Sequence, residues 1–534
     1  MLFLLIMACG QLTSESSAPL DLELHLGRFK LDREVRGAIA FAPGSIIPAT
    51  QVTAAASECD ATIGDRHVGT TWESAPDELS GVVSSSCGAP VWLELPPTPA
   101  EGTDGLLIIL DTLRYDHVGE LTPNIAAHAA RGWHGANGWS PSPWTIPSVS
   151  ALFTGRPPWA ITSPGDHRLP QQQTTLAELS PNHQTWMITT NAYVSSANGF
   201  DQGFSRFAYA DNDPSALSLA RQWLSEPSVG PRLLVVQLMS AHLPYQPSHP
   251  PAGGTDRVGD AFWDLDGWRS YQSEENRDRI RALYRGSVQD LDSYVGELLE
   301  MVDETWVTAL ISDHGEELWD HGGFEHGHAF WEEITRIHGS IVVPESPPTE
   351  DTSPYQTQDF GQRFALALGV ASQDSWATST DDAADVITFS HPLDTRDEVL
   401  HRWGVRTEEG ELLSGGTQMS LEGPSTQLHQ RLFQLTQAAN YGGPSSNTTC
   451  RIVISEGETV TVPSSATWGD QSPPSSWGEV KRGRDGSVSI TPVRSGEWLV
   501  QDGGGDECEI TTESEVVNFS EFEESALRAL GYLR

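Results

Sequence analysis

Four apolar runs constrain the fold of this chain more than any other feature of its sequence. They occupy residues 105–111, 184–190, 232–239 and 305–313, and segments with helical spacing of apolar residues separate them. Runs that are apolar throughout are typical of strands buried on both faces. Their alternation with helices is typical of a mostly parallel sheet. We therefore expect an α/β fold in which helices cover both faces of the sheet.

Helices are expected at residues 123–130, 147–154, 214–224 and 275–302. The last of them has apolar residues near helical spacing, so one of its faces should pack against the sheet. That face comprises Ile280, Leu283, Tyr284, Val288, Leu291, Val295 and Leu298.

The composition and the hydrophobic pattern change on either side of the α/β region, which we place at residues 101–441. Residues 19–100 hold short alternating runs divided by Gly, Pro and Ser, which predict an N-terminal β module. Residues 442–515 predict a C-terminal β module in the same way, and residues 516–534 return to helical spacing. A chain of 534 residues is long enough for several such units.

The N-terminus, residues 1–18, is interpreted as a lipoprotein-type signal and tether. The run MLFLLIMA before Cys9 is too short to span a bilayer, and it resembles the box that precedes the acylated cysteine of bacterial lipoproteins. The usual basic start is missing, and an ordinary apolar N-terminus is the alternative. We expect a periplasmic or lipid-anchored protein of the bacterial cell envelope, attached to the membrane only through Cys9.

The other four cysteines form two sequence-local pairs, Cys59 with Cys87 and Cys450 with Cys508. Two disulfides are the economical interpretation and four free thiols the alternative. Disulfides fit an oxidising compartment outside the cytoplasm.

The charge balance restricts the partners of the protein. With 31 basic and 73 acidic residues the net charge is −42, so the chain should repel nucleic acid and other polyanions. A small anionic ester would also be repelled at long range, and its binding would need local positive charge. We expect a small anionic ester or an envelope glycan or lipid as substrate, and no nucleic acid.

Polar side chains follow three of the apolar runs directly. Asp111 ends the first run, Asp313 and His314 end the last, and His242 follows the third. Ligands gather at the carboxyl ends of strands in a parallel sheet, so these side chains should face a common site. Carboxylates suit Ca²⁺, Mg²⁺ or Mn²⁺, and histidine shifts the preference toward Mn²⁺ or Zn²⁺.

Thr145 lies just before Pro147, where a helix is expected to begin. A metal-bound alcohol at a helix N-terminus can be deprotonated and attack phosphorus or sulfur, while the helix amides stabilise the developing anion. Capping the helix is the commoner role of threonine in such a position and is the alternative.

Five segments together resemble the sulfatase-like branch of the alkaline phosphatase superfamily in their order and spacing. Similarity extends from about Gly105 to about Leu413, and the final ALRALGYL resembles the terminal helix of the family. The segments are LIILDTLRYDHVG, TPNIAAHAARG, SPSPWTIPSVSALFTGRPP, AHLPY and ISDHGEELWDHGGFEHGHAFWEEITRIHGSIVVP.

The resemblance implies an alkaline phosphatase-like core and one divalent metal ion. It makes Asp111, Thr145, Asp313 and His314 the metal ligands, with Thr145 also at the position of the nucleophile.

By the same resemblance, His242 and His328 contact the transferred group or protonate the leaving oxygen, and His326 lies next to them. Arg114 and Asp116 belong to the first segment, and we interpret them as scaffold, with a solvated charge pair as the alternative.

Three positions depart from the pattern of typical sulfatases. Thr145 stands where they carry the Cys or Ser that is oxidised to formylglycine, Val149 where they carry Arg, and Thr112 where they carry a second Asp. Threonine cannot form that aldehyde. Threonine nucleophiles occur instead in the phosphodiesterases and phosphoglycerol transferases of the superfamily.

We therefore expect a metal-dependent hydrolase of sulfate or phosphate esters with Thr145 in place of formylglycine. A phosphoglycerol or phosphoethanolamine transferase of the cell envelope and a non-catalytic envelope binding protein are the alternatives. The acidic loop EELWDHGGFEH is interpreted as scaffold beside the site, with a second metal site as the alternative. Trp144 is a candidate wall of the pocket.

Overall fold

The computed structural model describes residues 28–31, 34–75, 78–96, 100–161, 168–228, 230–250 and 273–371, and strands between residues 386 and 502. The chain divides into two units, one formed by residues 1–31 and 35–96 and the other by residues 32–34 and 97–534. The expected lipid anchor at Cys9, its tether, Cys508 and the helix at 516–534 lie outside the described residues.

The central sheet of the second unit contains all four apolar runs as neighbouring strands. From β14 onward its order is β14-β13-β15-β11-β16-β19-β12-β20, with β21 also pairing β12. The strands from β14 to β16 are parallel, whereas β19 runs antiparallel to both β16 and β12. The bounds are β11 (Gly105–Leu110), β12 (Trp133–Trp139), β13 (Gln184–Thr189), β14 (Arg206–Tyr209), β15 (Arg232–Leu238), β16 (Val307–Ser312), β19 (Arg336–Val342), β20 (Thr349–Asp351) and β21 (Tyr355–Gln356).

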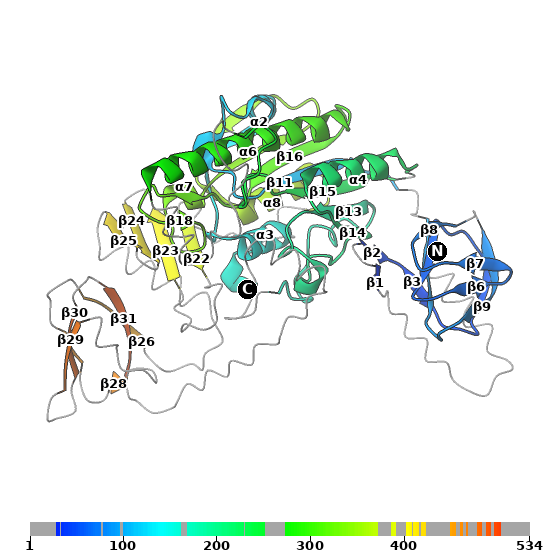
Figure 1. The fold of residues 1–534 in the computed structure, drawn as a ribbon, viewed down its shortest axis with the longest axis horizontal. Coiled ribbons are helices and arrows are strands. Elements are labelled where there is room, and N and C mark those ends of the chain that lie inside the picture. Colours follow the sequence, from blue (N-terminus) through cyan, green and yellow to red (C-terminus); the bar gives the residue numbers. More distant parts are fainter. Residues whose placement is uncertain are drawn as a thin grey trace. The chain divides into compact units, whose positions relative to one another are not determined.

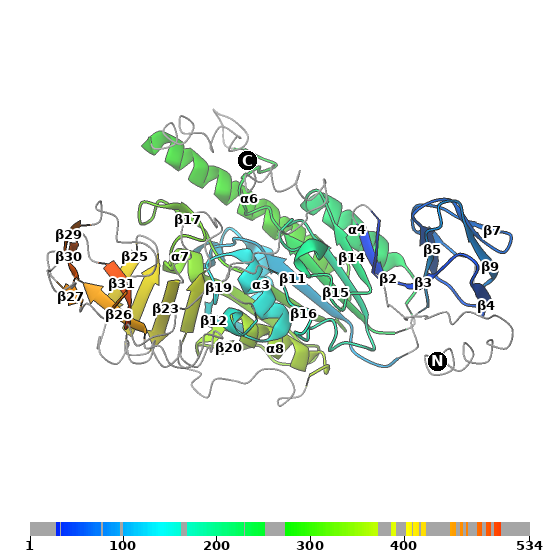
Figure 2. The same cartoon turned by 90° about the horizontal axis from the view of Figure 1, so that it is seen from below.

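Helices cover both faces of this sheet, so the predicted α/β fold is confirmed. In Figures 1 and 2, α2, α4 and α6 lie on one face and α3 and α8 on the other. Leu106 and Ile108 of β11 share one hydrophobic core with Leu283 and Leu291 of α6. The helices are α2 (Pro123–Ala129), α3 (Thr145–Thr154), α4 (Asp213–Ser225), α6 (Glu274–Glu300), α7 (Glu332–Thr335) and α8 (Thr357–Ala367). Short 3₁₀ turns are η1 (Tyr115–His117), η2 (Pro158–Ala160) and η3 (Ser196–Asn198).

Two small antiparallel sheets, β3-β10-β5-β8 and β4-β9-β6-β7, form the body of the N-terminal unit around a core of their own. The predicted disulfide between Cys59 and Cys87 is present in this unit. Its strands are β1 (Arg28–Leu31), β2 (Glu34–Gly37), β3 (Ile39–Phe41), β4 (Ile46–Thr50), β5 (Ala54–Ser57), β6 (Ala61–Ile63), β7 (Arg66–Val68), β8 (Glu73–Ser74), β9 (Leu79–Ser85) and β10 (Val91–Glu94).

The remaining strands, both within and after the α/β region, form small antiparallel sheets. The sheets are β17-β18, β22-β23-β24-β25, β26-β31-β28 and β27-β30-β29. Their bounds are β17 (Glu317–Leu318), β18 (Phe324–Glu325), β22 (Val386–Ser390), β23 (Arg402–Thr407), β24 (Gly410–Gly415), β25 (Gln418–Glu422), β26 (Thr449–Ile454), β27 (Val460–Val462), β28 (Ala466–Thr467), β29 (Gly478–Arg482), β30 (Val488–Pro492) and β31 (Gly496–Asp502). Within the described part of the chain, no helix is both long and apolar enough to cross a bilayer.

Candidate active site and metal centre

The ends of two neighbouring parallel strands bring three candidate ligands together. Leu110 of β11 pairs with Ser312 of β16, so Asp111 and Asp313 follow side by side, with His314 next to them. One ligand atom from each of these three side chains lies within 4.8 Å of the others. All three residues are fully buried. Among the described residues they form the one such group that could hold a metal ion.

Asp111 has one carboxylate oxygen bonded and one unbonded. Its Oδ2 accepts hydrogen bonds from Asn191 Nδ2 at 2.7 Å and from Gln237 Nε2 at 2.8 Å. Its Oδ1 is buried and has no hydrogen-bond partner among the described residues. Buried polar atoms are rarely left unpaired, so this oxygen is available for a ligand.

Asp313 and His314 likewise use one polar side-chain atom in hydrogen bonds to the backbone and leave the other facing the group. Asp313 Oδ1 accepts from the backbone amides of Thr112 (3.2 Å) and His314 (2.8 Å), whereas its buried Oδ2 has no hydrogen bond to the described part of the chain. The Nδ1 atom of His314 lies 2.9 Å from the carbonyl oxygen of Gly315, which fixes Nδ1 as the donor. Nε2 therefore carries the lone pair, 3.4 Å from Asp313 Oδ2 and 4.0 Å from Asp111 Oδ1.

Burial disfavours charge on all three groups. It raises the pKa of Asp111 to about 6, with the neighbouring Asp313 carboxylate adding to the rise. Burial raises the pKa of Asp313 to about 7 and lowers the pKa of His314 to about 4. Two buried carboxylates beside a neutral imidazole lack a compensating positive charge, which a divalent cation would supply.

Thr145 is the first residue of α3, and its side chain faces the same group. Its Oγ1 lies 3.2 Å from His314 Nε2 and 3.5 Å from Asn191 Nδ2. The helix begins two residues earlier than expected, its N-cap is Trp144, and no side chain caps it. The capping interpretation of Thr145 is therefore wrong. The hydroxyl lies instead at the positive end of the helix dipole.

Trp144 precedes this hydroxyl and is buried, with an exposed fraction of 2 %. Its ring meets that of Tyr193 edge to face, with the centroids 6.4 Å apart. The two rings form an aromatic pair next to Thr145 along the chain.

Two histidines lie beside His314. His242, which follows β15, is buried, and its Nδ1 lies 2.6 Å from the carbonyl oxygen of Leu243. The His326 ring is 4.5 Å from that of His314 and 5.1 Å from that of His242, measured between centroids. His328, which the sequence analysis favoured over His326, is half-buried, and its Nε2 lies 2.7 Å from Glu317 Oε2. The structure thus places His326 in ring contact with the group.

The acidic loop after β16 serves as scaffold. Glu316 accepts hydrogen bonds from Tyr245 and His326, and Glu317 accepts them from His328 and from two backbone amides. Asp320 pairs with Arg114 at 2.7 Å.

Arg114 also pairs with Asp116 at 2.7 Å. The Arg114 side chain is 6 % exposed and that of Asp116 38 %, so the guanidinium is buried, which supports the scaffold interpretation over a solvated charge pair.

Asn191 and Gln237, which were not among the predicted site residues, orient Asp111. Asn191 lies just after the end of β13, as Asp111 does after β11, so the same rule would have selected it. Gln237 is the one polar residue inside the apolar run LLVVQLM, and a buried amide in such a strand signals a specific partner.

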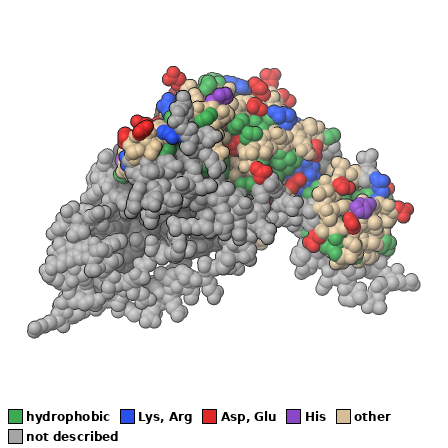
Figure 3. Space-filling model, viewed as in Figure 1, with side chains coloured by type: hydrophobic (Ala, Val, Ile, Leu, Met, Phe, Trp, Pro, Cys, Tyr) green, Lys and Arg blue, Asp and Glu red, His purple; other side chains and the backbone are tan. Residues whose placement is uncertain are grey.

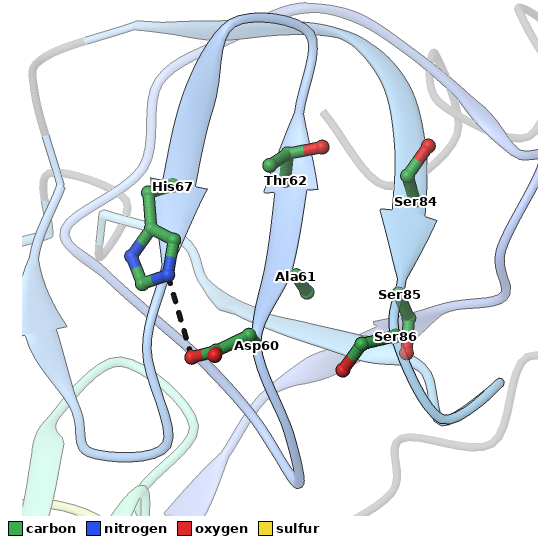
Figure 4. Close-up of a pocket in the computed structure, with 7 residues that line it drawn as sticks. All are labelled: Asp60, Ala61, Thr62, His67, Ser84, Ser85 and Ser86. Carbon is green, nitrogen blue, oxygen red and sulfur yellow. Dashed lines mark ion pairs between the residues drawn. The ribbon is translucent and has the colours of Figure 1, made fainter.

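A shallow hollow of about 310 Å³ lies elsewhere, on the N-terminal unit (Figure 4). It is lined by Asp60, Ala61, Thr62, His67, Ser84, Ser85 and Ser86. One ion pair in it joins His67 and Asp60 at 3.4 Å. The exposed fractions of these two side chains are 63 % and 79 %. These two groups are in contact with solvent. The hollow therefore differs from the site described above, whose polar groups are buried and converge.

A model of the sulfatase family matches residues 103–370 of the chain. A putative sulfatase from Bacteroides thetaiotaomicron VPI-5482 is similar in structure, with a TM-score of 0.50, 15 % sequence identity, and coverage of 64 % of this chain and 92 % of its own. BT4656, solved in complex with its substrate D-glucosamine-2-N,6-O-disulfate, has a TM-score of 0.49, 14 % identity and coverage of 64 % and 99 %. A phosphonate monoester hydrolase from Silicibacter pomeroyi has a TM-score of 0.46, 14 % identity and coverage of 63 % and 95 %. A comparison with curated proteins gave no match.

Proposed function

The chain belongs to the sulfatase family, and on that premise we propose that it is a metal-dependent hydrolase of phosphate or sulfate esters with Thr145 as its nucleophile. One observation carries the proposal. The Thr145 hydroxyl lies at the start of α3, 3.2 Å from His314 Nε2, next to carboxylates that each keep one buried oxygen unpaired.

The donor set fits a divalent cation. Asp111 Oδ1, Asp313 Oδ2, His314 Nε2 and Thr145 Oγ1 would hold it, because the two oxygens lack hydrogen bonds within the described residues and the nitrogen carries a lone pair. When bound, the cation would neutralise the carboxylates and lower the pKa of the threonine hydroxyl. The mixture of oxygen and nitrogen ligands does not separate Mn²⁺, Zn²⁺, Ca²⁺ and Mg²⁺.

The other roles in the reaction fall to residues of this chain. Thr145 Oγ1 attacks the phosphorus or sulfur atom of the ester, forming a covalent phospho- or sulfothreonine and expelling the alcohol. The amides of the first turn of α3 point toward the oxygens of the transferred group and stabilise their charge. His242 and His328 assist the leaving oxygen, as the family resemblance implies. Asn191 and Gln237 keep Asp111 in place.

The substrate is proposed to be a small anionic ester or an ester on an envelope glycan or lipid. A threonine cannot be converted to formylglycine, which favours a cycle through a phosphothreonine. The Cys59–Cys87 disulfide supports an extracytoplasmic location, and attachment through Cys9 remains part of the proposal.

Turnover assays on variants of α3 test the nucleophile. We expect Thr145→Ala to reduce the hydrolysis of p-nitrophenyl phosphate, bis-p-nitrophenyl phosphate or p-nitrophenyl sulfate by about 10³-fold or more, and Thr145→Ser to retain activity. Addition of Mn²⁺ or Ca²⁺ should support turnover, and a chelator should abolish it. Equal turnover by Thr145→Ala would exclude Thr145 as the nucleophile.

Thr154→Ala is the matched control. Thr154 belongs to the same helix, is also buried, and its hydroxyl donates along the helix to the carbonyl oxygen of Ser150 at 2.7 Å. The control should lose some stability and keep its activity. Adding glycerol to the assay separates hydrolysis from transfer, since a transferase would form a glycerol ester.

A further inference from the structure

Glu316 is a fully buried carboxylate of the loop beside the site. Its exposed fraction is 0 %, and both of its oxygens are bonded. Oε1 lies 2.9 Å from His326 Nδ1, and Oε2 accepts a hydrogen bond from the Tyr245 hydroxyl at 2.9 Å. Two partners on opposite sides fix the orientation of the carboxylate.

This carboxylate in turn fixes the imidazole of His326. A carboxylate can only accept, so the ring nitrogen facing Glu316 carries the proton and the other nitrogen, Nε2, carries a lone pair. The ring has an exposed fraction of only 6 % and packs between the rings of His314 and His242. An oriented base therefore lies against the group that contains Thr145.

The loop holds a second pair of this kind, but its geometry is reversed. In that pair His328 uses Nε2, not Nδ1, to contact Glu317. The Nε2 atom of His328 is therefore engaged with the loop, whereas Nε2 of His326 is the atom that Glu316 leaves available.

We propose that Glu316 is a positioning residue that holds His326 so that its Nε2 takes a proton from the water that hydrolyses the Thr145 adduct. This inference rests on the proposed function. The bond between water oxygen and phosphorus forms, and the bond between phosphorus and Thr145 Oγ1 breaks. The water proton passes to His326 Nε2, and the electron pair of the broken bond stays on Oγ1. The imidazolium, paired with Glu316, then returns the proton to restore the threonine hydroxyl.

Single-turnover kinetics separate the two halves of the reaction. With p-nitrophenyl phosphate, Glu316→Gln should release the first equivalent of nitrophenol at nearly the native rate. Its steady-state rate should fall by about 10²-fold, because only the second half lacks an oriented base. Phosphothreonine at position 145 should accumulate in acid-quenched samples and be detected by peptide mass spectrometry.

Two further variants keep the test informative if Glu316→Gln folds poorly. Tyr245→Phe removes only the hydrogen bond to Oε2 and should cause a smaller loss in the same step. His326→Gly should accumulate the adduct and recover its steady-state rate with added imidazole. Glu297→Gln, an exposed glutamate of α6 paired with Arg221, is the matched control and should leave both phases unchanged.

The outcomes distinguish the inference from its premise. A slowed burst without accumulated adduct in Glu316→Gln, or no rescue of His326→Gly by imidazole, would overturn the role of the pair. Absence of any adduct in the native enzyme, with full turnover by Thr145→Ala, would instead overturn the nucleophile itself.

Discussion

Thr112, directly after the candidate metal ligand Asp111, has a φ of 55°. A β-branched residue rarely adopts this left-handed conformation, because its Cβ crowds the following carbonyl group. The conformation directs the Thr112 amide to Asp313 Oδ1. Backbone strain at this position therefore accompanies the orientation of a candidate ligand.

Comparison of two truncations at this position tests the strain. Thr112→Gly and Thr112→Ala both lose the hydroxyl, but only glycine adopts the positive φ freely. We expect the glycine variant to have the larger free energy of unfolding, by about 1 kcal/mol, in urea denaturation. At the exposed helical position Gln289, the same pair should show the reverse order. An alanine variant at 112 as stable as the glycine variant would contradict the strain.

A divalent cation should stabilise the fold through the two aspartates. At a free concentration of about 100 times its Kd, Mn²⁺ should add about 2.7 kcal/mol to the free energy of unfolding, and a chelator should remove this gain. Asp111→Asn and Asp313→Asn should abolish the effect in thermal denaturation. The exposed control Asp303→Asn should respond like the native protein. If Mn²⁺ stabilised the native protein and all three variants equally, the cation would bind at another site.

Single residues of the site were predictable where one rule applied to them. Asp111, Asp313 and His314 each follow an apolar run, and the structure brings them together. His326 was not separable from His328, because only one residue lies between them in a loop whose path no periodicity determines. Glu316 was visible only as one acid among several, since its partner Tyr245 is 71 residues away in the chain.

At the scale of elements, the four apolar runs were located to within a few residues and are confirmed as neighbouring strands. Strands β12, β14 and β19 were missed. Their sequences, WHGANGW, RFAY and RIHGSIV, are either short or interrupted by glycine, histidine and arginine, and do not form an apolar run. Their strand conformation depends on pairing with distant neighbours, which a local pattern does not contain.

The start of α2 depends on an aspartate from another helix. Its N-cap residue, Thr122, makes no capping hydrogen bond. Asp292 of α6 instead accepts from the backbone amides of Asn124 at 3.1 Å and Ile125 at 2.9 Å. We expect Asp292→Ala to lower the free energy of unfolding by about 1–2 kcal/mol in urea denaturation. Glu297→Ala, an exposed site on the same helix, should change it by less than about 0.5 kcal/mol; similar losses from both would contradict the cap.

Two buried histidines connect α2 and β19 and should make stability depend on pH. His128 contacts the hydroxyls of Ser340 and Thr308, each at 2.9 Å, and His338 contacts Ser340 at 3.2 Å. Burial lowers the pKa of both histidines to about 3. Below pH 6.5 the unfolded chain binds protons that the folded chain does not, so stability falls as the pH drops toward 3.

At pH 5 this difference amounts to about 2 kcal/mol for each histidine. Urea denaturation of the native protein and His128→Gln between pH 8 and pH 5 measures it. The free energy of unfolding of the variant should depend less steeply on pH. The difference in slope should correspond to the uptake of up to one proton on unfolding, whatever the overall stability of the variant. An unchanged slope would contradict a neutral, buried His128.

At the scale of the whole molecule, the negative net charge should slow the association of an anionic substrate. On the face seen in Figure 3, Asp and Glu side chains are spread over the described surface, with Lys and Arg among them. A net charge of −42 repels an anionic ester at long range, and the proposed cation would supply the local positive charge at the site.

Salt should therefore help the enzyme. We expect the KM for a dianionic aryl phosphate to fall severalfold as KCl rises from low to moderate concentration, with kcat nearly constant, because salt screens the repulsion. A singly charged diester should respond less. A KM that rises with salt for both substrates would show that local attraction dominates.

The proposed chemistry requires that Asp111, Asp313, His314 and Thr145 hold one divalent cation. A crystal structure of the protein grown with MnCl₂, with diffraction recorded at the manganese absorption edge, tests it directly. We predict a single strong anomalous peak about 2.0–2.6 Å from Asp111 Oδ1, Asp313 Oδ2, His314 Nε2 and Thr145 Oγ1. A peak elsewhere, or none at these atoms with manganese in excess, would contradict it.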